Sequence, residues 1–299
     1  MRDPEQRRGG GARREDGPRR DGDRRSDPVW EPPAEFAAAV QVTDSERSWV
    51  RKHLGPFYER QLIEDVLYRI KAGKEATVYA CAGHPSTGRP RIAAKVYRQR
   101  SQRSTKNVSD YQQGRGLLDE EGNTTRKGGR RSGAPTRQKS KRGRDATQTS
   151  WLMHEYTLLE ALHGQGGDVP APIAHADNAL LMELIGDEHG AAPTLNDVVV
   201  PRDQAQKLFE RVLFNVELLL GMGWVHGDLS AYNMLYQDGR IVLIDFPQVA
   251  KCNANPRARG LFGRDIERVA QYFESCGLAI DAAQLAEELW SKHVPEPLA

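Results

Sequence analysis

Apolar residues follow two different spacings in the first hundred positions of the chain. Residues 36–66 repeat apolar side chains at helical intervals, and Pro56 is expected to divide this stretch into two helices. Three shorter runs follow, LYRI, TVYACAG and RIAAKVYR, which are rich in β-branched and aromatic residues and are separated by turns that contain glycine. Such runs with short connections predict an antiparallel β-sheet.

The pattern in the second half of the chain predicts mostly helices. The run SWLMHEYTLLEALHG ends at Gly164 and places on one helical face Trp151, Leu152, Leu158, Leu159 and Leu162. ALLMELIG is typical of a buried strand, and the stretch from Pro201 to Gly223 is typical of a long amphipathic helix. Two more helices are expected at residues 264–275 and 281–292. This order predicts an α+β protein with two lobes, an antiparallel sheet lobe and then a mainly helical lobe.

Two segments lack any such spacing. Residues 1–33 contain many arginine, aspartate, glycine and proline residues and few apolar ones, which is typical of a disordered tail. Residues 100–148 are rich in glycine, serine, arginine and lysine and are much longer than an ordinary loop, so they are interpreted as a flexible insertion. The predicted organisation places N-terminal helices and the first lobe, with its insertion, at residues 34–187 and the second lobe at residues 188–299.

Charge is unevenly distributed, which changes the expected partners. The formal net charge is only +2, but residues 98–148 carry 14 lysine and arginine residues against 5 acidic ones. A basic segment of this kind can bind the phosphates of RNA or of a ribosomal particle through counterion release. Tyr111 is its only aromatic residue, so base stacking is not expected, and a solvated flexible loop remains the alternative interpretation.

The remaining composition favours a cytoplasmic protein. The three cysteines are odd in number and show no metal-ligand spacing, which favours a reducing compartment. No apolar run approaches the roughly 18 residues of a membrane-spanning helix, and the arginine- and glycine-rich start lacks the apolar core of a signal peptide. We therefore expect a soluble, cytoplasmic protein that makes no use of a membrane.

The clearest candidate site is the stretch HGDLSAYNMLYQDGRIVLIDF at residues 226–246. Its Asp-Gly dipeptide separates two apolar runs, which is the strongest short signal for a two-residue hairpin turn of type I′. Such a hairpin folds Asp245 back beside Asn233, and Asp228 lies five residues before Asn233. Phosphoryl transfer needs one carboxylate to orient the attacking hydroxyl, and an amide and a second carboxylate to hold Mg²⁺ on the phosphates.

Each of these residues also has a structural interpretation. Aspartate and asparagine are common in turns and helix caps, and taken singly each is more often structural than catalytic. His226 is interpreted as a core histidine that orients the loop backbone. The ordered set, rather than any single residue, indicates a phosphoryl-transfer site at Asp228, Asn233 and Asp245.

Two charged residues in apolar surroundings support this hypothesis. Lys95 lies in the middle of the predicted strand IAAKVY, where an unpaired cation is rare. Glu155 lies on the apolar face of its predicted helix, four residues after Trp151 and four before Leu159. An ion pair between Lys95 and Glu155 would explain both positions and would leave the ammonium within reach of nucleotide phosphates. In the alternative, the two side chains reach water separately.

Weaker signals complete the candidate nucleotide site. The turn KAGKEA holds one glycine, Gly73, and its backbone amides could cover phosphates, although the pattern GxxxxGK[ST] is absent. The strand in ALLMELIG leads into Gly186 and is expected between the lobes. There the backbone groups of Glu183 and Ile185 could bind the edge of an adenine base.

The motifs GKEATVY, AAKVY, MELIG, HGDLSAYNMLY, LIDFPQ and LFGRD resemble, in order and spacing, the RIO family of atypical serine/threonine protein kinases, as a bacterial-type member. The resemblance covers roughly residues 60–275 and implies a trimmed protein-kinase fold that binds ATP and Mg²⁺. It implies Asp228 as the catalytic base, Asn233 and Asp245 as the metal ligands and Ser230 as a phosphate contact. In family members the metal-binding aspartate can itself be phosphorylated, so the resemblance also implies an ATPase-like cycle through Asp245.

The chain departs from ordinary protein kinases as well. IDFPQ takes the place of DFG, no APE follows, and few residues remain after Asp245 to form an activation segment or a peptide-docking surface. Two alternative functions therefore stay open. One is a small-molecule kinase of the aminoglycoside or choline type, which uses a similar loop but usually has a larger helical region around its substrate. The other is a scaffold that binds RNA or the ribosome through residues 100–148.

Overall fold

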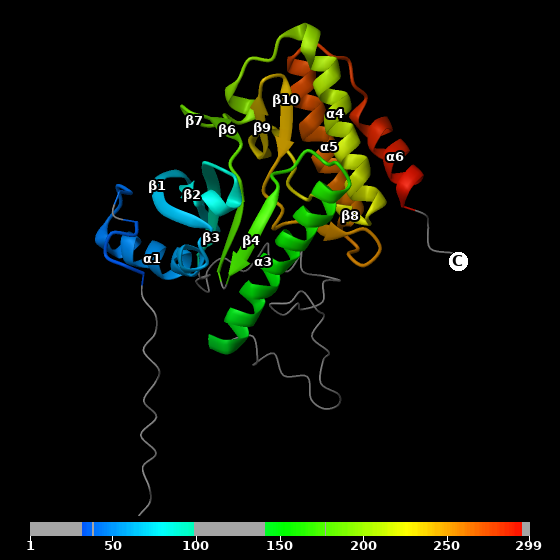
Figure 1. The fold of residues 1–299 in the computed structure, drawn as a ribbon. Coiled ribbons are helices and arrows are strands. Elements are labelled where there is room, and N and C mark those ends of the chain that lie inside the picture. Colours follow the sequence, from blue (N-terminus) through cyan, green and yellow to red (C-terminus); the bar gives the residue numbers. More distant parts are fainter. Residues whose placement is uncertain (1–31, 38, 99–140, 177, 295–299) are drawn as a thin grey trace, which may run out of the picture. The chain divides into compact units, whose positions relative to one another are not determined.

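A five-stranded antiparallel sheet forms the first lobe (Figure 1). Its strands, in spatial order, are β1 (Ile63–Ala72), β2 (Ala76–Gly83), β3 (Arg91–Tyr97), β5 (Ala179–Glu183) and β4 (Pro172–Ala176). The antiparallel sheet and the strand within ALLMELIG are confirmed, but the sequence analysis does not predict β4. The segment PIAHA is short and starts with proline, so it carries little strand signal of its own. Its pairing with β5 makes it a strand.

The computed structural model describes residues 32–98 and 141–294, apart from residues 38 and 177. Nearly all of the predicted tail at residues 1–33 and the predicted insertion up to residue 140 lie outside the described residues. Both interpretations therefore stay predictions. The described residues belong to one compact unit, so the predicted lobe boundary between residues 187 and 188 also stays a prediction.

Helix α1 (Asp44–Glu59) corrects the prediction of two helices over residues 36–66. The helix begins after Thr43, whose side chain accepts a hydrogen bond from the Glu46 amide, and it continues through Pro56. Pro56 lies in the last turn and supplies no amide to the ladder, so it removes one hydrogen bond near the end of the helix, while its carbonyl still accepts the Arg60 amide. The residues after 62 are not helical because they pair with β2 in β1.

The α1 helix covers one face of the sheet. Val50, Leu54 and Phe57 are fully buried in a cluster that also contains Tyr79 of β2 and Ala94 of β3. Side chains alternate between the two faces of a strand. The neighbouring residues of β2 and β3 therefore face the opposite side of the sheet.

Helix α3 (Lys141–Gly164) begins earlier than the sequence analysis predicts. Its first turns occupy residues 141–148, which the interpretation as a flexible insertion includes, so this part of the prediction is wrong. Lysine, arginine, alanine and glutamine favour helix formation, and the amphipathic run that follows extends the helix toward its N-terminus. The C-terminal end at Gly164 agrees with the prediction.

The second lobe packs three helices around a common core (Figure 1). They are α4 (Arg202–Gly221), α5 (Ala258–Ser275) and α6 (Ala282–His293). The predicted helices are confirmed, although α5 starts before residue 264.

The segments between the longer elements contain short strands and turns. The short strands are β6 (Gly186–Asp187), β7 (Gly190–Ala191), β8 (Trp224–Val225) and β11 (Ala250–Lys251). Short 3₁₀ helices lie at Pro85–Thr87, Leu195–Asp197 and Ala231–Asn233.

The predicted hairpin is confirmed as β9 (Met234–Gln237) and β10 (Arg240–Leu243). Its turn residues Asp238 and Gly239 have φ values of 50° and 74°. Positive φ at both central positions defines the predicted type I′ turn. None of the described helices is long and apolar enough to cross a membrane.

Candidate functional site

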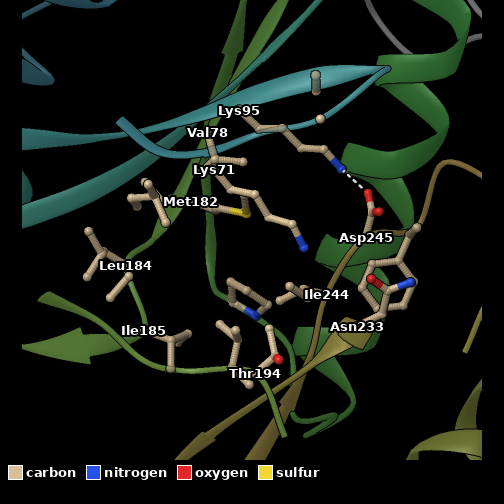
Figure 2. Close-up of a pocket in the computed structure, with 18 of the residues that line it drawn as sticks. Lys71, Val78, Lys95, Met182, Leu184, Ile185, Thr194, Asn233, Ile244 and Asp245 are labelled. Carbon is tan, nitrogen blue, oxygen red and sulfur yellow. Dashed lines mark hydrogen bonds and ion pairs between the residues drawn. The ribbon is translucent and has the colours of Figure 1, made fainter. Parts of the chain in front are cut away.

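A cleft of about 1180 Å³ lies between the sheet and the β9–β10 hairpin (Figure 2). Seven of the predicted site residues line this cleft: Gly73, Lys95, Glu155, Glu183, Ile185, Asn233 and Asp245. Asp228 and Ser230 do not. The structure thus brings together residues from β3, α3, β5 and the hairpin, which lie far apart in the sequence.

Lys95 forms ion pairs with two carboxylates that line the cleft. Its Nζ lies 2.6 Å from Glu155 Oε1. It also lies 2.7 Å from Asp245 Oδ1, the contact drawn as a dashed line in Figure 2. The predicted Lys95–Glu155 ion pair is confirmed, with the two side chains 8% and 2% exposed. Burial favours the neutral amine, but Asp245 and Glu155 outweigh it and raise the pKa of Lys95, so the ammonium stays charged. The contact with Asp245 is not predicted from the sequence.

Tyr97 is a residue of this network that the sequence analysis misses. Its buried hydroxyl donates a hydrogen bond to Glu155 Oε2, the oxygen that Lys95 does not contact. Burial and the nearby Glu155 raise the pKa of the Tyr97 hydroxyl, which keeps it a donor. Tyr97 lies two residues after Lys95 in β3 and therefore on the same face of the sheet. That spacing is the signal that could have identified it.

Asp245 has a constrained backbone that fixes its position. Its φ is 71°, in the left-handed region that non-glycine residues rarely occupy and that costs on the order of 1–3 kcal/mol. The preceding residue, Ile244, donates its amide to the Asn233 carbonyl at 2.9 Å, which joins the end of the hairpin to its start. Desolvation alone would raise the pKa of Asp245, but the Lys95 ammonium lowers it below its usual range. The side chain is therefore an anion facing the cleft.

Asn233 and Asp245 form an oxygen donor set that fits a magnesium ion. The Asn233 Nδ2 donates to the Asp228 carbonyl at 2.8 Å, which leaves the amide oxygen without a partner among the described residues. The Asp245 side chain is 44% exposed and uses one oxygen for Lys95. Carboxylate and amide oxygens are suitable ligands for Mg²⁺, which usually takes few protein ligands and keeps several waters.

Asp228 lies beside this donor set but outside the cleft lining. Its Oδ1 lies 2.7 Å from Nη1 of Arg268 in α5, and the two side chains form a partly exposed ion pair. Asp265, one turn earlier in α5, accepts hydrogen bonds from the Gly227 and Leu229 amides at 2.7 and 2.9 Å. One turn of α5 therefore holds both the backbone and the side chain of Asp228. The sequence analysis predicts neither contact.

The position of Asp265 within α5 carries a signal like that of Glu155. It is 2% exposed and lies among buried apolar residues of the helix: Leu261, Phe262, Ile266 and Val269. A carboxylate on the apolar face of a helix requires hydrogen-bond donors, because burying it without partners is costly. Its donors come from a loop 36 and 38 residues earlier in the chain.

The Asp265 carboxyl makes the stability of the protein depend on pH. Burial raises its pKa to about 7, although the Gly227 and Leu229 amides act to lower it. An unfolded aspartate titrates near 3.9, so the folded protein holds more protons than the unfolded chain between about pH 4 and pH 7. The Asp265 contribution to the free energy of unfolding is therefore fully present below about pH 4 and is lost as the pH rises through 7.

Denaturant unfolding of the wild type and of Asp265→Asn across this pH range measures the contribution. Asparagine keeps one acceptor oxygen but does not titrate. We expect the free energy of unfolding of the wild type to fall relative to that of Asp265→Asn as the pH increases from about 5 to about 8. A difference that stays constant over the range would show that Asp265 does not titrate there.

His226 is a core histidine, as predicted. It is 2% exposed, its Nε2 lies 3.3 Å from the Ile244 carbonyl, and its ring packs against Phe246 with centroids 4.9 Å apart. Desolvation lowers the pKa of His226, so the ring is neutral at neutral pH. The residue supports the backbone next to Asp245 and does not line the cleft.

The weaker sequence signals have mixed outcomes. Gly73 lines the cleft, but its amide donates to the Ala76 carbonyl at 2.8 Å and is not available for a phosphate, which corrects that part of the prediction. The Ile185 carbonyl accepts the Ala192 amide, while the Ile185 amide has no partner in the described part of the chain. The Glu183 amide donates to the Ala171 carbonyl, so Glu183 could contact a base only through its carbonyl.

Ser230 does not line the cleft, and its predicted contact with a phosphate stays a prediction. It precedes the 3₁₀ helix Ala231–Asn233, and its carbonyl accepts the Asn233 amide at 2.9 Å. The residue thus shapes the loop that presents Asn233. The sequence motif alone does not reveal this structural role of Ser230, because the direction of a side chain in a loop depends on the loop backbone.

Comparison with solved structures defines the class of protein. The structure is similar to that of the Rio2 kinase from Chaetomium thermophilum, with a TM-score of 0.53, 21% sequence identity, and coverage of 81% of this chain and 68% of that chain. A second structure, the ADP/Mg²⁺-phosphoaspartate complex of the same kinase, gives a TM-score of 0.52 at 21% identity and covers 79% of this chain and 65% of that one. The fold is that of a trimmed protein kinase.

Sequence comparisons identify the family within this class. Residues 77–285 match the family model of the RIO domain. The chain is 31% identical over 218 residues to a RIO-type serine/threonine-protein kinase Rio1 of Haloferax volcanii, covering 73% of this chain and 66%, just under two thirds, of that protein. It is 32% identical over 142 residues to the Rio1 of Thermoplasma acidophilum, covering 48% of this chain and 73% of the relative. The chain belongs to the RIO family.

Proposed function

We propose that this chain is an ATP- and Mg²⁺-dependent serine/threonine protein kinase of the RIO type. The observation that carries the proposal is the bridge from Lys95 to both Glu155 and Asp245 in the cleft. A buried lysine lies between two carboxylates, beside an asparagine whose amide oxygen has no partner within the described ranges. This arrangement supplies the charges that phosphoryl transfer requires.

Each residue has a role in this proposal. The Lys95 ammonium contacts nucleotide phosphates while Glu155 and Tyr97 hold it in place. The Ile185 amide and the Glu183 carbonyl bind the edge of the adenine base. Asn233 and Asp245 hold Mg²⁺, which when bound neutralises charge on the phosphates.

Asp228 is the proposed base that orients the acceptor hydroxyl. Arg268 holds Oδ1 at 2.7 Å, and Oδ2, which accepts only a long 3.5 Å hydrogen bond from Asn233, is the oxygen proposed to accept the hydroxyl proton. Asp265 supports the same loop through the Gly227 and Leu229 amides. Phosphoryl transfer depends mainly on such positioning, because the protein forms few new bonds in the reaction.

An ATPase route through Asp245 belongs to the same proposal. An Asp245 carboxylate oxygen bonds to the γ-phosphorus as the bond to the bridging oxygen breaks and ADP leaves, and water then hydrolyses the acyl phosphate and regenerates the carboxylate. The similar Chaetomium structure is described as a phosphoaspartate complex, which supports this route. Label that hydroxylamine removes would assign the phosphoryl group to Asp245, whereas stable label would assign it to a hydroxyl.

A test of the kinase proposal uses γ-labelled ATP, Mg²⁺ and two kinds of acceptor. We expect label on serine or threonine of a protein acceptor such as casein, or on the chain itself. Label on an aminoglycoside or on choline, with none on protein, would favour the small-molecule kinase instead. The family match argues against that alternative, because it covers residues 77–285, which include the loop at residues 226–233 and α5.

The basic residues 100–148 remain a proposed contact with RNA or a ribosomal particle in the cytoplasm. The support is the excess of lysine and arginine in this segment. Because α3 begins at Lys141, a deletion that tests the segment should end at residue 140. RNA affinity that is unchanged by the deletion at low salt would remove the proposal.

A further inference from the structure

Lys71 is a second lysine of the cleft, which the sequence analysis does not single out. It lies near the end of β1 and lines the cleft. Figure 2 shows its side chain extending from the sheet with the ammonium in the middle of the cleft, between Asp245 on one side and Leu184 and Ile185 on the other. The residue is exposed, so its charge is available to a ligand in the cleft.

The register of the sheet explains this direction. Lys71 lies opposite Val78 of β2, and Val78 lies opposite Lys95 of β3. Residues directly opposite each other in neighbouring antiparallel strands point to the same face. The three side chains therefore form one row across the face that lines the cleft, with a lysine at each end and Val78 between them. Strands lie about 4.8 Å apart, so the two lysine backbones are about 10 Å apart.

The two lysines differ in their partners. Lys95 is engaged by Glu155 and Asp245, so this group of three carries a net charge of −1. Among the described residues Lys71 makes no ion pair. Lys71 is thus a cation of the cleft whose charge is not already neutralised.

A nucleotide polyphosphate needs more positive charge than Lys95 can offer. Lys95 shares one charge between two carboxylates, and both Lys71 and a bound magnesium ion would face the same phosphates. A lysine ammonium is a compact charge on a flexible stem that can follow a phosphate chain. The arginines of the cleft lining are already engaged: Arg69 pairs with Glu46, and Arg98 donates to Thr77. Lys74 also lines the cleft, but it lies in the turn after β1 and outside the row formed by Lys71, Val78 and Lys95.

We propose that Lys71 binds the phosphates of a nucleoside diphosphate or triphosphate, as a second phosphate-binding residue opposite Lys95 in the cleft. This inference rests on the proposed function, since it assumes that the cleft takes a nucleotide. It adds a residue from β1, on the side of the cleft where the predicted role of the Gly73 amide is not available.

The test compares dissociation constants for adenosine, AMP, ADP and ATP in Mg²⁺ by isothermal titration calorimetry. Lys71→Met removes the charge and keeps the apolar stem. We expect the dissociation constants of ADP and ATP to rise about tenfold, which corresponds to about 1.4 kcal/mol, while that of adenosine is unchanged. Lys71→Arg should restore most of the affinity.

Lys52→Met is the matched control, because Lys52 is an exposed lysine of α1, the helix that covers the opposite face of the sheet. Unchanged ADP and ATP affinity in Lys71→Met, or an equal loss for adenosine and ATP, would overturn the inference while leaving the proposed function intact. A wild-type protein that binds neither ADP nor ATP would instead overturn the proposed function together with the inference.

Discussion

Replacement of Asp228 by asparagine is expected to lower the rate of phosphoryl transfer by about 10²–10⁴-fold, the usual contribution of a positioned general base. Asparagine keeps the shape of the side chain and removes the carboxylate oxygen that would accept the proton. Affinity for ATP should stay close to the wild-type value, because Asp228 does not line the cleft. The expected signature is a low kcat with a nearly unchanged KM for ATP.

Steady-state kinetics of label transfer from ATP measure both quantities. Glu267→Gln is a suitable control, because Glu267 is an exposed carboxylate of α5 next to Arg268 and has no proposed role. It should leave kcat within a factor of about two. If Asp228→Asn retains the wild-type kcat, Asp228 is not the base, and its ion pair with Arg268 is only structural.

Replacement of Lys95 by alanine is expected to reduce the free energy of unfolding by about 3–5 kcal/mol, in addition to abolishing activity. Glu155 is 2% exposed, and Lys95 is its charged partner in the cleft. Removing Lys95 leaves this carboxylate buried without a cation, and Asp245 loses the same partner. The large effect follows from the unpaired charge rather than from the lost contact itself.

A double variant separates stability from activity. Combining Lys95→Met with Glu155→Gln removes the unpaired buried charge, and the amide oxygen introduced at position 155 can still accept the Tyr97 hydroxyl. We expect this variant to recover most of the lost stability while remaining inactive. Denaturant unfolding of the wild type and both variants gives the comparison. A wild-type free energy of unfolding in Lys95→Ala would mean that the carboxylates do not depend on Lys95.

Local sequence signals predicted the parts of the site whose physical requirement can be seen within one short stretch of sequence. The Asp-Gly turn defined the hairpin, and the charges of Lys95 and Glu155 in apolar surroundings revealed a buried ion pair across 60 residues. In each case the physical requirement is visible in the sequence itself. A turn needs positive φ at two positions, and a buried charge needs a partner.

Contacts that depend on the assembled fold could not be predicted in the same way. Asp245, with its backbone at a positive φ, contacts Lys95 across 150 residues, and Arg268 of α5 contacts Asp228 across 40 residues. The helix predicted through Val66 failed for a related reason. Strand pairing with β2 outweighs the helical spacing of the apolar residues there.

The most direct test of the central claim, that this cleft transfers the γ-phosphate of ATP, is a measurement of label leaving γ-labelled ATP in the presence of the chain, with and without Mg²⁺. The account predicts transfer to protein or to water by the wild type, dependent on Mg²⁺, and only background release by Asp245→Asn. Equal turnover by the two proteins, or no turnover by the wild type above the enzyme-free reaction, would contradict it.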